Sequence, residues 1–117
     1  MTEFLEVDEF SKDIKKLTKK YKTLFDDLET FKKALEAVLP NHLPKTVQIP
    51  GLGKDVKVPI FKVRRFRCKY LGRGSNSGIR VIYAYEKDED RITLIEMYYK
   101  GDKANEDRRR ILKYCKT

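Results

Sequence analysis

The chain has 117 residues, of which 40% are hydrophobic and 38% charged, and its net charge is +9. This length allows one compact core but not two ordinary domains, so residues 1–117 are predicted to form a single domain. No stretch approaches the roughly 20 apolar residues of a membrane span, and the first residues do not resemble a signal segment, so we expect a cytoplasmic protein without membrane contact.

Two amphipathic helices are predicted at the start of the chain. Apolar side chains recur at spacings of three and four between Asp8 and Tyr21 and again between Leu24 and Val38. Thr23 followed by Asp26 resembles a capping box, and Pro40 ends the second helix. Because the break between the two segments is short, they are predicted to form an antiparallel helical hairpin.

A proline-rich connection follows, and then three strand-like runs. The connection has the pattern of an irregular segment with a short hairpin over 46–58. Strands are predicted at Ile60–Tyr70, Gly78–Glu86 and Arg91–Lys100, which are rich in Val, Ile, Phe and Tyr. In the first run the alternation slips at Arg64-Arg65, as a β-bulge would produce.

A final helix is predicted from Glu106 to about Lys116, with Asn105 as its cap. The expected order is therefore ααβββα. The predicted fold class is α+β, with the N-terminal helical hairpin packed on a small, mainly antiparallel sheet and a C-terminal helix. Cys68 and Cys115 match no metal-binding spacing, so we expect two reduced structural thiols.

The positive charge is concentrated in one segment. Residues 56–85 contain eight Lys or Arg and no carboxylate, whereas residues 1–55 carry ten Lys and ten acidic side chains. Natural surfaces usually mix the two signs, so this segment favours a polyanion site over a basic surface kept for solubility. A partner of this kind is nucleic acid or an acidic protein.

Several kinds of chemistry are excluded. His42 is the single histidine and lies in the proline-rich connection, which excludes a two-histidine ribonuclease and a His-rich metal site, so no metal or other cofactor is expected. No phosphate-binding glycine motif opens a helix. The segment Gly72–Gly78, with three glycines, has two interpretations of equal weight: a flexible hairpin loop, or a loop that approaches phosphate and adds the charge of Arg73.

Arg, Lys and Tyr gathered on a sheet are sufficient to accelerate RNA cleavage, because the 2′-hydroxyl of the substrate is the nucleophile. Arginine binds phosphate oxygens through two parallel hydrogen bonds, a lysine among cations has a lowered pKa, and tyrosine stacks on a base or donates a proton. Glu96, Tyr98 and Lys100 alternate onto one face of the last strand and Tyr99 onto the other. For Glu96 an ion pair with a neighbouring arginine is the more common role, and a general base is the alternative.

At these residues the chain resembles the RelE/ParE toxin superfamily, particularly its RelE and HigB-like branches. The similarity rests on Phe61–Arg64, on the glycine-rich loop that leads into Ser77–Tyr83, and on Leu94–Lys100 followed by Asn105–Asp107 and a terminal helix. It spans most of the chain, and the two leading helices agree with it.

The resemblance implies a toxin of a type II toxin-antitoxin system, an endoribonuclease (mRNA interferase) that cuts mRNA on the ribosome and is held by an acidic antitoxin. Carried over residue by residue, Arg80 holds the scissile phosphate and Lys62 and Arg64 serve as base and charge stabiliser. Lys100 takes the basic position at the end of the last strand. Relatives often place the proton donor near the C-terminus, where this chain has Glu106-Asp107, so Tyr98 or Tyr99 is assigned that role.

The sequence analysis therefore predicts a metal-independent, ribosome-dependent endoribonuclease. Its catalytic residues are predicted to be Arg80, Lys100, Arg64, Lys62, Glu96, Tyr98 and Tyr99, and its further RNA-binding residues Arg65, Arg67, Lys69 and Arg73. The alternatives are a ParE-like or degenerate member that binds its target without cutting, and a non-catalytic RNA-binding module.

Overall fold

A computed structural model of the protein describes residues 1–72 and 76–115. Over these residues the chain forms three α-helices, one short 3-10 helix and a five-stranded mixed sheet, which confirms the α+β class. The elements in chain order are β1 (Glu3–Glu6), α1 (Asp8–Thr18), α2 (Leu24–Val38), β2 (Thr46–Gln48), β3 (Ile60–Val63), η1 (Lys69–Leu71), β4 (Ile79–Glu86), β5 (Arg91–Tyr99) and α3 (Arg108–Cys115).

The sheet has the strand order β1-β5-β4-β3-β2 and separates two apolar clusters. One face of the sheet packs against α1 and α2, and the larger core lies there. The other face packs against α3 and the connection before β3. All neighbouring strands are antiparallel except β1, which runs parallel to β5, so the prediction of a mainly antiparallel sheet is confirmed.

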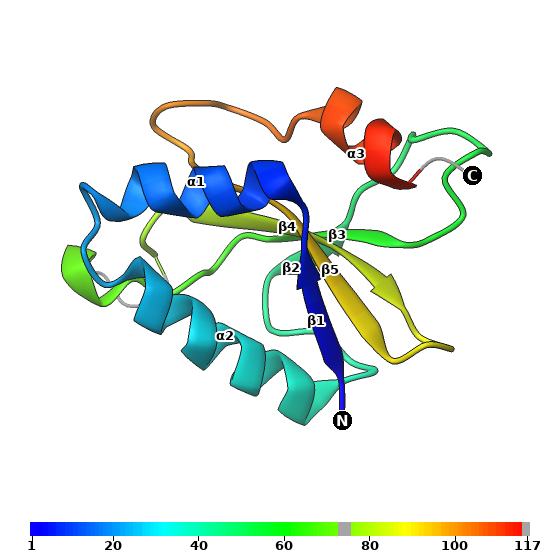
Figure 1. Ribbon diagram of the computed structural model, residues 1–117, viewed down its shortest axis with the longest axis horizontal. Coiled ribbons are helices and arrows are strands. Elements are labelled where there is room, and N and C mark those ends of the chain that lie inside the picture. The colour runs from blue at the N-terminus through cyan, green and yellow to red at the C-terminus, as the bar shows by residue number, and fades with distance from the viewer. Residues whose placement is uncertain (73–75, 116–117) are drawn as a thin grey trace.

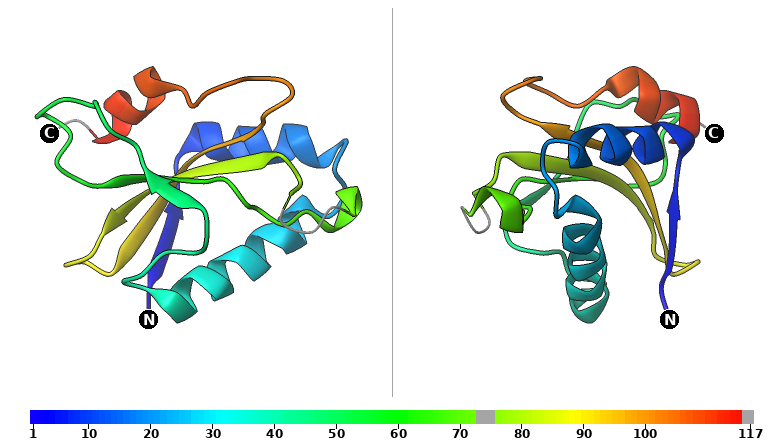
Figure 2. Two further views of the ribbon diagram at one scale, coloured as in Figure 1. Left: turned by 180° about the vertical axis from the view of Figure 1, so that it is seen from behind. Right: turned by 60° about the vertical axis from the view of Figure 1, so that its left-hand side comes forward.

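The two N-terminal helices are present, but their arrangement differs from the prediction. α1 stops at Thr18 rather than Tyr21, and α2 has the predicted bounds. The helices diverge from their connecting turn instead of lying side by side (Figures 1 and 2), because α1 packs mainly on β5. The capping box is also wrong: the Thr23 hydroxyl donates to Asp27 and accepts from the amide of Tyr70.

Two short edge strands were not predicted. β1 pairs with the first half of β5, and β2 pairs with β3 rather than within a hairpin over 46–58. Each has only three or four residues, mostly exposed, so neither carries the alternation that identifies a strand. The predicted strand Ile60–Tyr70 is correct only to Val63, after which the chain leaves the sheet and forms η1.

A β-bulge lies in β5 rather than at Arg64-Arg65. Ile82 pairs with Glu96 but Tyr83 pairs with Leu94, which leaves Ile95 as the extra residue. Beyond the end of β1, the edge of β5 is covered by side chains instead of by a strand. Asp13 of α1 accepts a hydrogen bond from the amide of Met97 at 3.0 Å, and Arg110 of α3 donates to the carbonyl of Ile95 at 3.0 Å and pairs with Asp13 at 2.6 Å.

α3 begins two residues later than predicted. Asp107, not Asn105, caps it by accepting a hydrogen bond from the amide of Arg110 at 3.2 Å. Ile111 and Cys115 dock on the sheet as expected. Cys68 and Cys115 are both free and buried, and burial raises the pKa of the Cys115 thiol to about 11, as suits a structural role. None of the helices within residues 1–72 and 76–115 has the length and apolar character needed to cross a bilayer.

Candidate functional site

Cationic side chains line an open cavity at the beginning of β4. This cavity, here called the cationic cavity, has a volume of about 360 Å³ and is lined by Lys45, Val47, Arg64, Arg65, Asn76, Gly78, Arg80 and Lys100. Five of these eight residues are Lys or Arg, and no carboxylate is among them. A concentration of uncompensated cations in a concave surface is the electrostatic setting that attracts phosphate.

Strand pairing explains how residues distant in sequence meet in the cavity. Arg80 lies in β4 directly opposite Tyr98 of β5, and the amide of Lys100, just beyond β5, donates to the carbonyl of Gly78 at 2.9 Å. Arg64 follows the last residue of β3. Its carbonyl accepts a hydrogen bond from the Arg80 guanidinium at 2.7 Å, which orients that side chain at the cavity. The structure therefore brings together Arg80, Arg64 and Lys100, as predicted.

Two further residues complete the cavity: Lys45, which was not predicted, and Gly78, which ends the glycine-rich loop for which a phosphate-approaching role was one of two interpretations. Lys45 has a positive φ of 61°, and its carbonyl accepts a hydrogen bond from the amide of Arg64 at 3.2 Å. Gly78 has φ 84°, and a Cβ there would come within 2.9 Å of the Tyr99 ring, so the wall at this point needs glycine. A lysine in an irregular, proline-rich segment gives no sequence signal of this position.

Lys62 is not among the residues that line the cationic cavity, and its ammonium is held in an ion pair. Its ammonium contacts Glu106 at 2.9 Å, and the side chains are 17% and 8% exposed. Burial acts to raise the pKa of Glu106, but the hydrogen bond and charge of Lys62, together with Arg108, outweigh it and hold the pKa below its ordinary value. The predicted base therefore points to the α3 side of the sheet, where it is neutralised.

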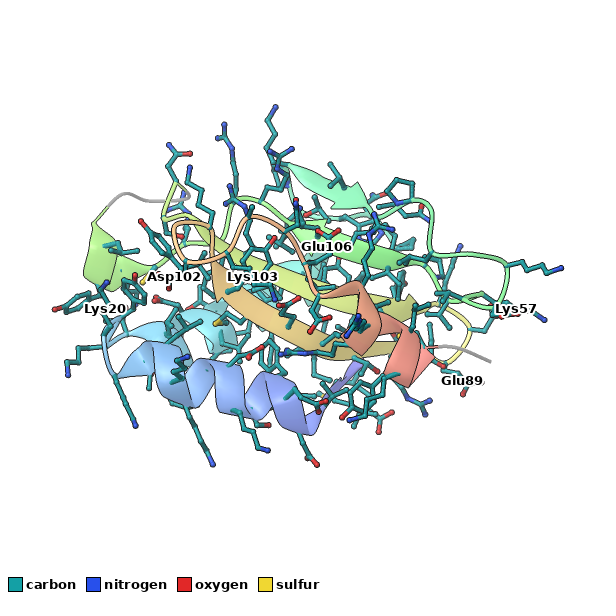
Figure 3. The ribbon with its side chains drawn as sticks, turned by 90° about the horizontal axis from the view of Figure 1, so that it is seen from above. Lys20, Lys57, Glu89, Asp102, Lys103 and Glu106 are labelled. Carbon is teal, nitrogen blue, oxygen red and sulfur yellow. The ribbon has the colours of Figure 1, made fainter. Side chains whose placement is uncertain are left out.

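Glu96 is buried and holds the connection between β5 and α3. Its carboxylate pairs with Lys103 and accepts a hydrogen bond from the amide of Asp107 at 2.8 Å. Lys103 and Glu106 lie over the strands in Figure 3, so this connection covers the sheet with two ion pairs. The partner of Glu96 is a lysine seven residues away rather than the expected neighbouring arginine.

The two candidate tyrosines lie on opposite faces of β5, as the alternation predicted. Tyr98 is 6% exposed, and its hydroxyl is a buried polar group without a hydrogen-bond partner among the described residues. Burial raises the pKa of Tyr98. Tyr99 faces the helices, with its ring 5.6 Å from that of Tyr21. Neither tyrosine is among the described lining residues of the cationic cavity: Tyr98 is the strand partner of Arg80 and lies near the charge of Lys62, whereas the Tyr99 ring lies against Gly78.

His42 is on the helical face and is engaged within the core. Its ring stacks on Phe61 at 3.9 Å between centroids, and Nδ1 is hydrogen-bonded to the Tyr83 hydroxyl at 2.5 Å. Burial lowers the pKa of His42. This packing gives the side chain a structural role.

The remaining predicted RNA-binding residues lie beside a second concavity. Arg65 lines both the cationic cavity and this apolar groove, and Arg67 and Lys69 line the groove alone. Arg73 lies outside the described residues, so the glycine-rich loop is represented at the site by Asn76 and Gly78. Within residues 1–72 and 76–115 no three His, Cys, Asp or Glu side chains gather as a metal site.

Comparison with known proteins adds no family to these observations. No family model, no curated protein and no solved structure matches the chain. The geometry and charge of the site are therefore the grounds on which a function is proposed.

Proposed function

We propose that the protein binds RNA through the cationic cavity and cleaves it there, as a RelE-like toxin. The observation that supports this most directly is the set of five Lys and Arg side chains around one concavity, with no carboxylate among the described residues that line it. Since the phosphate backbone dominates affinity for nucleic acids, such a lining favours RNA over an uncharged ligand.

The proposed reaction needs little more than positioning and charge. The 2′-oxygen forms a bond to phosphorus while the bond to the 5′-oxygen breaks, which leaves a cyclic phosphate and a 5′-hydroxyl. Arg80, Arg64 and Lys100 are proposed to stabilise the extra negative charge on the phosphate. Tyr98 is proposed as the donor of a proton to the leaving oxygen. Glu96 would accept the proton of the 2′-hydroxyl once its ion pair opens, and Lys62 would do so only after its ammonium has left Glu106 and released its own proton to solvent.

The proposed biological setting is that of a type II toxin-antitoxin system. Ribosome-bound mRNA in the cytoplasm is the proposed substrate, and an acidic antitoxin is the proposed inhibitor, because it would compete for the same cations. Induction of the protein in cells, with new mRNA 5′ ends mapped within minutes, tests this setting. Cuts phased with codons support it, and growth arrest without new 5′ ends contradicts it.

A second candidate function is binding without cutting, either in the manner of a ParE-like or degenerate member or as an RNA-binding module. It is favoured by one observation: both candidate bases, Lys62 and Glu96, are occupied by ion pairs. The same induction experiment separates the two, because a binder leaves mRNA intact.

Salt dependence tests whether RNA contacts this surface at all. Because Lys and Arg side chains that engage phosphates release counterions, RNA affinity should fall as the salt concentration is raised. A plot of log affinity against log salt concentration should have a slope of several units. Binding of an acidic protein partner, aided by apolar contacts, should fall less. Changing Arg65, Arg67 and Lys69 together to Ser should flatten the RNA slope, and an unchanged slope would remove these residues from the interface.

A further inference from the structure

An apolar groove opens between α2 and the segment that follows β3. Its volume is about 560 Å³, within the roughly 300–1,000 Å³ of small-molecule sites. The walls are formed by Phe31 and Ala34 of α2, Leu43 and Pro44 of the connection, and Cys68. Phe31 is fixed from behind, since its ring lies 5.5 Å from that of Phe66 and 6.4 Å from that of Tyr83. The groove is thus a preformed apolar surface.

The rim of this groove is cationic. Arg65, Arg67 and Lys69 line it and are exposed. Among the described residues that line the groove the one acid is Asp27, which is 4% exposed and accepts hydrogen bonds from the Thr23 hydroxyl at 2.8 Å and from the amide of Lys69 at 3.2 Å. A ligand of this groove is therefore expected to combine a flat or apolar part with negative charge.

Arg65 connects the groove to the cationic cavity, because it lines both. We infer that the groove is a nucleobase-binding subsite, which receives an unstacked base of the RNA strand whose phosphate occupies the cationic cavity. The inference rests on the proposed function and adds a substrate class to it. A nucleotide strand carries the required combination, since its charged backbone and its flat apolar bases follow each other at fixed spacing.

The groove selects single-stranded over paired RNA. In a duplex the bases are stacked and paired, and they cannot enter a groove in a protein surface. Arginine planes and apolar side chains offer stacking surfaces to a base that is splayed out, and Arg65 and Arg67 with Leu43 and Pro44 supply them. Loss of one such contact typically weakens binding about tenfold or more.

The test uses single-stranded RNA oligonucleotides of roughly eight nucleotides, a length within the site sizes of single-strand binders. They carry 2′-O-methyl groups so that no nucleophile is available. The first probe is intact, the second is abasic with the same number of phosphates, and the third is the intact strand annealed to its complement. The 117-residue chain should bind the abasic probe and the duplex about tenfold more weakly than the intact single strand.

Ala34→Gln supplies the matched variant. Ala34 is exposed on α2 and lines the groove, whereas Ala37 is exposed on the same helix and does not. Glutamine is a good helix former, and circular dichroism checks that both variants fold. Ala34→Gln should lower affinity for the intact probe about tenfold and leave affinity for the abasic probe unchanged. Ala37→Gln should change neither.

The outcomes separate the inference from the proposed function. Equal binding of intact and abasic probes, lost in Arg80→Ala, would overturn the base subsite while supporting the cationic cavity, and would leave the groove to another partner such as an acidic protein segment. Failure of every probe to bind, or binding that does not depend on Arg80, would overturn both. Abasic-sensitive binding that Ala34→Gln leaves intact would place the base elsewhere and also overturn the inference.

Discussion

Two neighbouring regions of the molecule contain similar cations, but in one region the cations are paired with carboxylates and in the other they are not. Under α3 and the connection that precedes it, Lys62 pairs with Glu106, Lys103 with Glu96 and Arg110 with Asp13. In the cationic cavity, Arg80, Arg64 and Lys100 make no ion pair with a carboxylate of the described residues. The first set is satisfied inside the fold and the second is available to a ligand. Residue type alone therefore does not distinguish a paired cation from an available one; the distribution of nearby carboxylates does.

The largest expected effect is in the cavity. Arg80→Ala should lower the rate of RNA cleavage about 100-fold, or about 3 kcal/mol, because a contact to the transition-state charge is lost without damage to the core. Single-turnover cleavage and growth arrest are the measurements. Arg109→Ala removes the same charge from an exposed position on α3 and should be neutral. Full toxicity of a folded Arg80→Ala protein would end the assignment.

On the paired side, Glu96→Ala should reduce stability rather than RNA affinity. It leaves the amide of Asp107 and the Lys103 ammonium without their acceptor, which should cost about 2 kcal/mol because Lys103 stays partly solvated. Urea unfolding measures this cost, and Glu96→Gln should keep part of the stability through its amide oxygen. A stable Glu96→Gln protein that binds RNA but no longer cleaves it would instead identify Glu96 as the base.

The Lys62–Glu106 pair should show a coupling of about 1–2 kcal/mol in a double-mutant cycle with Lys62→Met and Glu106→Gln. The pair also predicts a pH response. Since the folded-state pKa of Glu106 is depressed, its contribution is complete above the ordinary value of 4.5 and is lost as pH falls through the lower folded value. The free energy of unfolding, measured from pH 6 downward, should therefore decline less steeply in Glu106→Gln than in the unchanged protein. The same decline with falling pH in both proteins would contradict the pairing.

The smallest effect is expected on the helical face. His42→Ala should reduce the free energy of unfolding by about 1 kcal/mol through loss of its contacts to Phe61 and Tyr83, while cleavage per folded molecule is unchanged. Thermal unfolding and single-turnover cleavage report the two quantities separately. Loss of cleavage from this change alone would replace the proposed mechanism with a histidine-based one.

Elements with strong periodicity were predictable from sequence, and short edge elements were not. α2, β4 and β5 have at least eight residues each and strong apolar patterns, so their predicted bounds agree with the structure to within a residue. β1 and β2 depend on partners elsewhere in the chain. The bulge was misplaced because the slip in apolar pattern after Val63 reflects departure from the sheet, whereas the extra residue Ile95 is identified only by strand register.

The candidate site also has some features that could be predicted from the sequence and others that could not. Arg80 and Lys100 were predictable as neighbours because adjacent strands place them there. The engagement of Lys62 by Glu106 joins residues 44 apart, and Lys45 reaches the cavity through a backbone conformation that no local pattern specifies. Pairing of this kind depends on tertiary structure, which composition and spacing do not contain.

The hydrogen bond from Arg80 to the carbonyl of Arg64 has a thermodynamic consequence. A guanidinium carries five N–H donors, so one is used to fix the side chain and the others remain for phosphate. Immobilising a long side chain on binding usually costs about 0.5–1.5 kcal/mol, and here part of that ordering precedes the ligand. Phosphate binding at this arginine should therefore show a smaller unfavourable conformational entropy in calorimetry than binding at the exposed Arg67.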